Sequence, residues 1–316
     1  MPNLALSSCW NSHRHTDGYE MLSEIAGLGF THVELSHGIR IVLVPGIIRA
    51  IEEGVIQVAS THNFCPLPTG VMHAAPNYFE PSALHASEHE QWIRYTTRSI
   101  DFAAQVNARL IVMHLGSVRF LWLNPEHKID AYQEQHPDTN LREDAAYKTL
   151  LAKSLARLRK HAPKYYERMK ASLTQVLAHA AEKNISLGLE NREAFTELPI
   201  DDSFPDLFAA LPSPNTCGYW HDVGHANLKE NLGILNHREH LQQNADRLLG
   251  FHLHDVSKDN HDHQPIGTGR IDFDMIAEFF RPHHLFTLEL SPRTRSADVR
   301  SSKELIQARI DKLPPQ

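Results

Sequence analysis

Histidines and carboxylates recur in this sequence at the ends of short, mostly apolar runs. Six such runs end in His62, His114, Glu190-Asn191, His221-Asp222, His252-Leu253-His254 and Glu289. Carboxylate oxygens and imidazole nitrogens are the usual protein ligands of Mn²⁺, Mg²⁺, Co²⁺ and Zn²⁺. Charged and imidazole groups that converge away from water need a counter-charge, which a divalent cation supplies directly. The pattern therefore predicts a divalent metal centre, provided that the fold brings these ends together.

Expected strands and helices alternate along the whole chain, and these elements must position the candidate ligands. Eight β-rich runs are expected, at residues 3–8, 31–36, 56–61, 109–115, 185–190, 216–222, 248–254 and 285–290. Helical patterns fall between them, for example at residues 17–28, 87–107 and 296–312. Strands that alternate with helices indicate βα units and a parallel sheet. Eight units without a break in composition predict an α/β fold, a single (β/α)8 TIM barrel over residues 1–316, with its site at the C-terminal ends of the strands.

An extended insertion follows the fourth expected strand, at residues 116–184. Its first part, up to about residue 142, has the character of a loop. Its second part carries apolar residues at helical spacing, and Pro163 should kink or split that helix. A long connection also follows the third strand, at residues 62–86. Both connections lie on the face that carries the site. They could form a lid over the site or pack on the outer helices without a role in it, and the sequence leaves both alternatives open.

The bulk composition narrows the class of protein. The chain has 316 residues, a formal net charge of −7 and three widely spaced cysteines, Cys9, Cys65 and Cys217. The cysteines indicate a reducing compartment, and the sequence has neither a signal-peptide pattern nor an apolar run of about 20 residues. We therefore expect a cytoplasmic protein without a membrane span. The acidic balance disfavours nucleic acid as a partner, and a homo-oligomer formed through outer helices stays open.

Most of the 23 histidines need no special role. We expect those in loops and helices on the surface, namely His73, His85, His89, His136, His237, His240 and the pair His283-His284. Aromatic residues are candidates for the walls of a pocket, namely Trp220, Trp122 and Phe64, with a place in the core as the alternative.

Taken in order, the strand-end motifs resemble the xylose-isomerase-like barrel superfamily, which includes sugar isomerases and epimerases as well as endonuclease IV-like hydrolases. The resemblance spans nearly the whole chain. The motifs that carry it are His62-Asn63-Phe64-Cys65-Pro66, Leu189-Glu190-Asn191, Asp222-Val223-Gly224-His225-Ala226, His252-Leu253-His254-Asp255, His263-Gln264-Pro265-Ile266-Gly267-Thr268-Gly269 and Leu288-Glu289.

In the isomerase and epimerase branch, the resemblance implies one catalytic metal with four ligands, Glu190, Asp222, His252 and Glu289. Neighbouring carbonyl and hydroxyl oxygens of a sugar, polyol or sugar phosphate would chelate the metal, which stabilises an enediolate as a Lewis acid. Glu190 and Glu289 would remove and return a proton on carbon. The resemblance thus implies a metal-dependent isomerase or epimerase, and an inosose-type dehydratase that uses the same enediolate chemistry is an alternative.

In the hydrolase branch, the resemblance implies a three-zinc cluster with more ligands. The candidates for a second metal or for substrate contacts are His62, His114, His225, His254, His261 and His263. The chain departs from that branch at His261, where an aspartate would be expected. An endonuclease IV-like phosphodiester hydrolase is therefore the second alternative, and a barrel that only binds a sugar or a metal is the third.

Overall fold

Eight parallel strands close into a barrel in chain order, with β8 paired to β1. The computed structural model describes residues 4–137, 139–212 and 216–314. Asn3, the first residue of the expected strand 3–8, lies outside these ranges. The strands are β1 (Leu4–Ser7), β2 (His32–Leu35), β3 (Gln57–His62), β4 (Leu110–Met113), β5 (Ser186–Glu190), β6 (Cys217–Asp222), β7 (Leu248–Leu253) and β8 (Leu285–Leu288). The predicted (β/α)8 barrel is confirmed.

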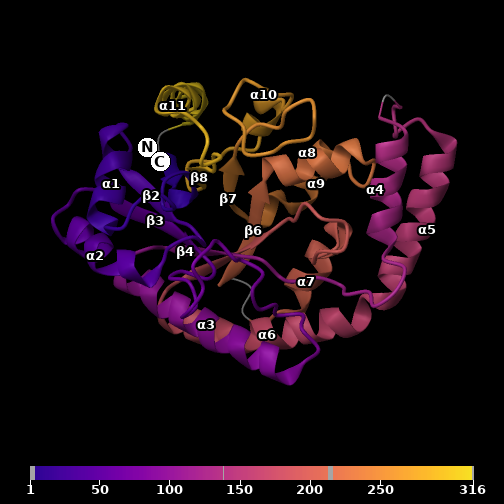
Figure 1. Cartoon of the computed structure of the whole chain (residues 1–316), viewed down its shortest axis with the longest axis horizontal. Coiled ribbons are helices and arrows are strands. Elements are labelled where there is room, and N and C mark those ends of the chain that lie inside the picture. The colour runs from indigo at the N-terminus through magenta and orange to yellow at the C-terminus, as the bar shows by residue number, and fades with distance from the viewer. Residues whose placement is uncertain (1–3, 138, 213–215, 315–316) are drawn as a thin grey trace.

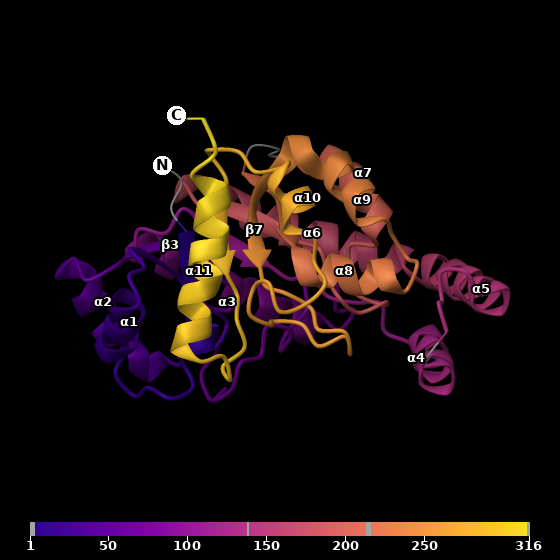
Figure 2. The ribbon, with the colours of Figure 1, turned by 90° about the horizontal axis from the view of Figure 1, so that it is seen from above.

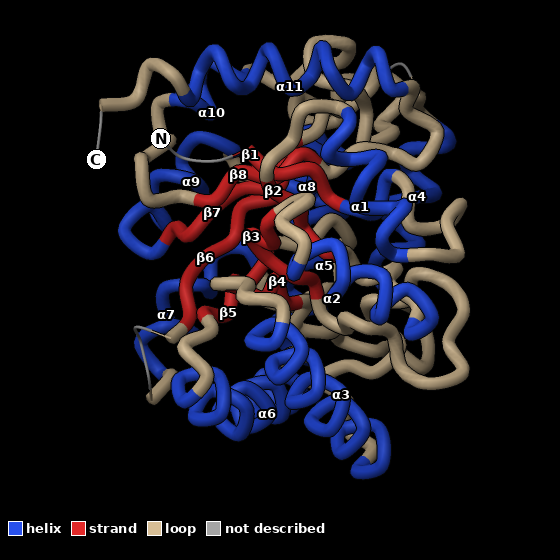
Figure 3. The backbone as a smooth tube through the Cα atoms, turned by 90° about the vertical axis from the view of Figure 1, so that its left-hand side faces the viewer, coloured by secondary structure: helices blue, strands red, loops and turns tan. Residues whose placement is uncertain are grey.

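Helices surround the strands on the outside of the barrel (Figure 1). They are α1 (Gly18–Gly27), α2 (Val44–Glu52), α3 (Ala86–Gln105), α4 (Pro125–Gln135), α5 (Ala145–His161), α6 (Pro163–Glu182), α7 (Phe204–Ala210), α8 (Val223–Asn231), α9 (His237–Asn244), α10 (Phe273–Ala277) and α11 (Ser296–Ile310). Figure 3 shows the strands at the centre of this shell, with α3 and α6 side by side along one flank. Among the described residues, no helix is both long and apolar enough to cross a membrane.

A single large side chain fills the barrel interior below the strand ends. Trp220 of β6 is fully buried and packs with Leu110 and Val112 of β4. A Cβ atom at Gly250 would lie 2.5 Å from Cζ3 of Trp220, so β7 has room for the indole only because this position carries no side chain. The indole lies edge-to-face against His252, with 5.1 Å between the ring centroids. Trp220 therefore supports the strand-end residues from below and belongs to the core.

The connection between β4 and β5 contains three helices. Residues 116–142 are not all loop, because α4 begins at Pro125, where the side chain of Asn124 accepts a hydrogen bond from the backbone of Glu126. The sequence pattern did not indicate α4 because only Pro125 and Ile129 of this helix are buried. The predicted break at Pro163 is confirmed, since it separates α5 from α6. In Figure 2, α4 and α5 project together from one side of the molecule.

Candidate metal centre

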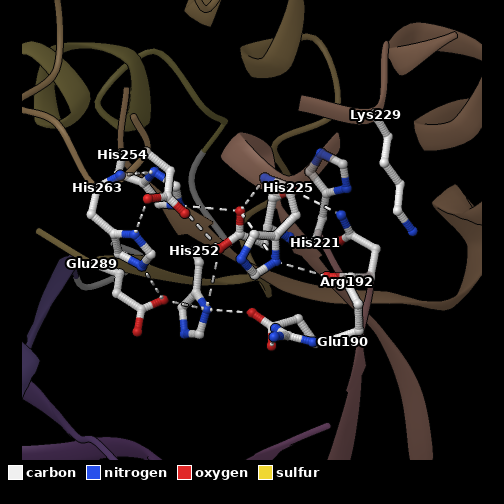
Figure 4. A network of polar contacts seen from close by, with 12 residues as sticks. Glu190, Arg192, His221, His225, Lys229, His252, His254, His263 and Glu289 are labelled. Carbon is white, nitrogen blue, oxygen red and sulfur yellow. Dashed lines mark hydrogen bonds and ion pairs between the residues drawn. The ribbon is translucent and has the colours of Figure 1, made fainter. Parts of the chain in front are cut away.

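The strand ends bring four potential ligands together, Glu190, Asp222, His252 and Glu289. They come from the ends of β5 and β6, from β7 and from the residue after β8, and one ligand atom from each lies within 4.8 Å of the others. All four are buried, with 5% exposure or less. Figure 4 shows three of these side chains, Glu190, His252 and Glu289, pointing toward one another.

His252 lies at the centre of this group. Its Nδ1 atom is 2.8 Å from Oε1 of Glu190, 2.8 Å from Oε2 of Glu289 and 3.8 Å from Oδ2 of Asp222. One imidazole nitrogen offers a single hydrogen or lone pair to three carboxylates, whereas a divalent cation balances all three and accepts the nitrogen as well. The donor set of buried oxygens and one imidazole therefore fits such a cation.

Glu34 of β2 extends the group on the other side of His252. Its Oε1 atom lies 3.1 Å from Nε2 of His252, and its Oε2 atom accepts a hydrogen bond from Ser60 at 2.8 Å. Burial alone would lower the pKa of His252, but the carboxylates of Glu289 and Glu34 raise it well above its ordinary value. Glu34 was absent from the prediction, although it alternates with the apolar Val33 and Leu35, and this alternation places it on the opposite face of the strand.

Glu190 also has a second set of partners. Its Oε2 atom is 2.8 Å from Nε2 of His114, 3.7 Å from Nε2 of His62 and 2.9 Å from Nη1 of Arg192. Arg192 is buried and pairs with Glu197 as well, at 3.1 Å. Burial would raise the pKa of Glu190, but Arg192 and the hydrogen bond from His114 hold it well below its usual range. His62, His114 and Glu190 form a second group with metal-ligand spacing.

Asp222 organises the residues around the start of α8. Its side chain caps this helix by accepting a hydrogen bond from the backbone of His225 at 2.8 Å. Its Oδ2 atom also lies 3.1 Å from Nε2 of His254, whose ring stacks on that of His263 with 4.3 Å between centroids. Nδ1 of His263 pairs with Asp262 at 3.0 Å, and its Nε2 is 3.9 Å from Oε2 of Glu289.

Five of the six additional histidines thus lie around the four-ligand group, and His225 forms a third group with Glu193 and Asp262. The structure does not bring His261 into these groups. His261 is exposed in a turn, where its backbone N–H donates to Ser257, and none of the three groups found among the described residues contains it. Asp262 has the position beside His263 instead. The sequence did not indicate that Asp262, and not His261, is the side chain that contacts His263.

Residues 22–309 match the family described as xylose isomerase-like TIM barrel. The chain belongs to this family. An uncharacterized protein of Methanocaldococcus jannaschii is 22% identical over 210 residues, which cover 66% of this chain and 58% of that protein. The match thus spans well under two thirds of that relative.

Solved structures of sugar epimerases and of an epimerase-like protein share the fold of this family member. A D-tagatose 3-epimerase-like protein is 16% identical, with a TM-score of 0.68 and coverage of 98% of this chain and 97% of the other. D-Allulose 3-epimerase from Methylomonas sp. is 12% identical, with a TM-score of 0.67 and 98% coverage of both chains. L-Ribulose 3-epimerase is 13% identical, with a TM-score of 0.67 and coverage of 98% and 95%.

In this xylose isomerase-like barrel, a cavity of about 670 Å³ reaches the four-ligand group through Glu289. His263 and Asp262 also line it, together with residues of the loops that follow β1, β2, β3 and β8. Cavities of this size accommodate small molecules. Trp220, Trp122 and Phe64 are not among its lining residues: Trp220 and Phe64 are fully buried, whereas Trp122 is 83% exposed.

Several histidines expected on the surface are buried instead, namely His89, His237, His240 and His284. Two of them join a chain of hydrogen bonds behind β6, on the side of the strand that faces the helices. Nε2 of His237 lies 2.8 Å from Nε2 of His221, and the hydroxyl of Tyr219 lies 2.7 Å from Nδ1 of His221 and 2.8 Å from Nε2 of His240. The surface prediction was wrong here because imidazoles that pair with one another can be buried without a charge.

Proposed function

We propose that this protein is a divalent-metal-dependent sugar isomerase or epimerase. The observation that carries the proposal is that two buried carboxylates, Glu190 and Glu289, converge on Nδ1 of His252 at 2.8 Å each, while Glu289 also lines the cavity. Paired carboxylates beside a metal site suit proton transfer at carbon. The likeness of the fold to the sugar epimerases named above supports a sugar as the substrate class.

Glu190, Asp222, His252 and Glu289 would hold the cation. When bound, a divalent cation polarises the adjacent carbonyl and hydroxyl oxygens of a sugar and so acidifies the hydrogen on the carbon beside the carbonyl. Oxygen ligands with one imidazole suit Mn²⁺, Mg²⁺, Co²⁺ and Zn²⁺ alike.

The two glutamates would divide the proton transfer between them. Glu190 would take the proton from carbon as a charged base, and Glu289, which faces the cavity, would return one after protonation from solvent. Return to the same carbon from the other face gives an epimer, whereas return to the neighbouring carbon gives an isomer. Arg192 and His114 hold Glu190 in its charged form and in a fixed orientation.

Exchange of substrate hydrogen with solvent tests this proposal. The metal-loaded protein is incubated in D₂O with a panel of ketoses and aldoses, and proton NMR records the loss of the exchanging C–H signal. We expect Glu190→Gln and Glu289→Gln to keep the fold and to slow exchange by about 10²-fold or more. Glu20→Gln, at an exposed position of α1, is the matched control. Near-normal exchange by either site variant would refute the assigned roles.

A multi-zinc phosphodiester hydrolase is the second candidate, because His62, His114 and Glu190 form a further group with metal-ligand spacing. The two candidates differ in how His114→Ala acts. In a hydrolase this variant should lose one of several bound zinc ions. In an isomerase or epimerase the metal content should stay at about one ion per chain, because the four-ligand group does not include His114.

A further inference from the structure

Two chemically different sets of residues line the cavity, called here its metal end and its loop end. Glu289, Asp262 and His263 lie at the metal end. The other end is formed by the loops after β1, β2 and β3, and its lining residues include a guanidinium and three imidazoles but no carboxylate. These four residues are Arg40, His13, His73 and His37, and the ring of His37 lies against that of His62, with 4.7 Å between the centroids. Among the described residues that line the cavity, the carboxylates are therefore Glu289 and Asp262, and the guanidinium is that of Arg40.

Arg40 is the fixed charge at the loop end. It is half-buried, and its Nη2 atom donates to the backbone carbonyl of Ser12 at 3.2 Å and to that of His15. These two contacts orient the guanidinium and leave its Nη1 and Nε donors for another partner. Within the part of the chain that the structure describes, no carboxylate forms an ion pair with Arg40.

Glu24, a carboxylate close to His13 and His15, already has two cationic partners. Glu24 pairs with Arg14 at 2.8 Å and with His15 at 2.7 Å. His13 shows the excess of positive charge that results: burial lowers its pKa, and Arg14, His15 and Arg40 lower it further. A partly desolvated guanidinium without an anionic partner is unfavourable, and its planar fork matches a carboxylate or a phosphate.

We propose that the loop end of the cavity binds an anionic group of the substrate, a carboxylate or a phosphate, through Arg40. The inference rests on the proposed function, because it assigns the metal end to the reacting carbons. Because Arg40 would attract the anionic group, it would also fix which end of the sugar meets the metal. The protein therefore acts on acidic or phosphorylated sugars in preference to neutral ones.

The test compares matched anionic and neutral sugars on the metal-loaded protein. One pair is a ketopentose 5-phosphate with the free ketopentose, and the other is a ketohexuronate with the free ketohexose. We expect kcat/KM to favour an anionic member by at least about tenfold, since a neutral sugar leaves Arg40 desolvated and unpaired. Whichever anionic sugar is favoured distinguishes a phosphate from a carboxylate. Equal or better turnover of the neutral members overturns the inference.

Variants of Arg40 test whether this residue causes the preference for anionic sugars. Arg40→Met should remove the preference and weaken the binding of inorganic phosphate or acetate, measured by calorimetry, by at least about tenfold. Arg40→Lys keeps the charge without the planar fork and should be intermediate. Arg14→Met is the control, since Arg14 pairs with Glu24 and does not line the cavity. Unchanged anion binding in both Arg40 variants contradicts the proposal.

The outcomes also separate this inference from the proposed function. Hydrogen exchange on neutral sugars that is insensitive to Arg40 keeps the proposed function and overturns the anion site. Anion binding that depends on Arg40, without hydrogen exchange on any sugar, keeps the anion site and refutes the proposed function. Circular dichroism and thermal unfolding show whether Arg40→Met disturbs the loop carbonyls of Ser12 and His15; if it does, Arg40→Lys decides.

Discussion

At the scale of single residues, the imidazole of His252 lies between two sets of carboxylates. Its Nδ1 atom faces Glu190 and Glu289, and its Nε2 atom faces Glu34. A metal-binding imidazole usually donates its other N–H to a carboxylate, which fixes the tautomer and strengthens the ligand. Glu34 has this geometry, so we assign it as a positioning residue for His252.

Replacing Glu34 tests this assignment. Glu34→Gln keeps the size of the side chain but removes the charge that favours an Nε2–H tautomer of His252. We expect the affinity for Mn²⁺ or Co²⁺ to fall by about 10- to 100-fold, measured by calorimetry. Glu20→Gln, on the exposed face of α1, should bind the metal as the wild type does. Wild-type affinity in Glu34→Gln would show that Glu34 has only a packing role.

The sequence indicated the site residues at or next to the ends of strands. It did not indicate Glu34, inside β2, or Arg192, in the loop after β5. Glu190, Asp222, His252 and Glu289 stood out because each closes an apolar run, and the barrel brings such ends together. Glu34 lies inside its strand, in the run Val33-Glu34-Leu35, and its partner His252 is 218 residues away in the sequence. Arg192 lies in a loop whose path depends on its pairing with Glu190 and Glu197, which no local pattern encodes.

At the scale of elements, a chain of hydrogen bonds joins β6 to α9. One set of tautomers satisfies every contact: His237 donates from Nε2 to His221, His221 donates from Nδ1 to Tyr219, and Tyr219 donates to Nε2 of His240. In this direction Nε2 of His221 and Nε2 of His240 accept hydrogen bonds, so these two imidazoles must be neutral. Burial, aided by His240, lowers the pKa of His237 to about 3, and burial lowers that of His240 to about 4.

This chain predicts a loss of stability in mild acid. In the unfolded protein both histidines titrate near about 6.5, so their contribution is complete above that pH. It decreases as the pH falls toward 4 and 3, the values in the folded state. The free energy of unfolding should fall by up to about 1.4 kcal/mol per pH unit for each group. Urea denaturation at pH values between 7.5 and 5 measures this slope.

A double variant isolates the two histidines from other titrating groups. His237→Gln with His240→Gln retains an amide donor and an amide acceptor but cannot be protonated in this range. We expect a flatter dependence of stability on pH than in the wild type. The same slope in both proteins would show that acid acts elsewhere. His237 and His240 were expected on the surface, since their helix is polar along most of its length and the partners lie in β6, which is distant in sequence.

For the whole molecule, the barrel was predictable because eight βα units repeat without interruption, and their order alone implies closure. Within the insertion, Pro163 marked the end of α5, whereas α4 had too few buried positions to show a period. The path of α4 and α5 depends instead on distant contacts, such as the hydrogen bond from the hydroxyl of Tyr147 to the carbonyl of Leu232 at 3.0 Å.

Metal binding should also stabilise the whole barrel. Glu34, Glu190, Asp222 and Glu289 are buried close together, so a bound cation relieves their repulsion. A metal at about 100 times its dissociation constant adds about 3 kcal/mol to the free energy of unfolding. We expect chelation to lower the midpoint of thermal unfolding by several degrees and added Mn²⁺, Co²⁺ or Zn²⁺ to restore it. A midpoint that is insensitive to both treatments would argue against a resident cation.

The central claim is that the strand ends hold one divalent cation through Glu190, Asp222, His252 and Glu289. Its most direct test is the metal content per chain, determined by elemental analysis of protein purified without added metal or chelator. We predict about one divalent ion per chain in the wild type and its loss in Asp222→Asn and His252→Ala. Two or three zinc ions per chain, or a metal content that survives both substitutions, would contradict the account.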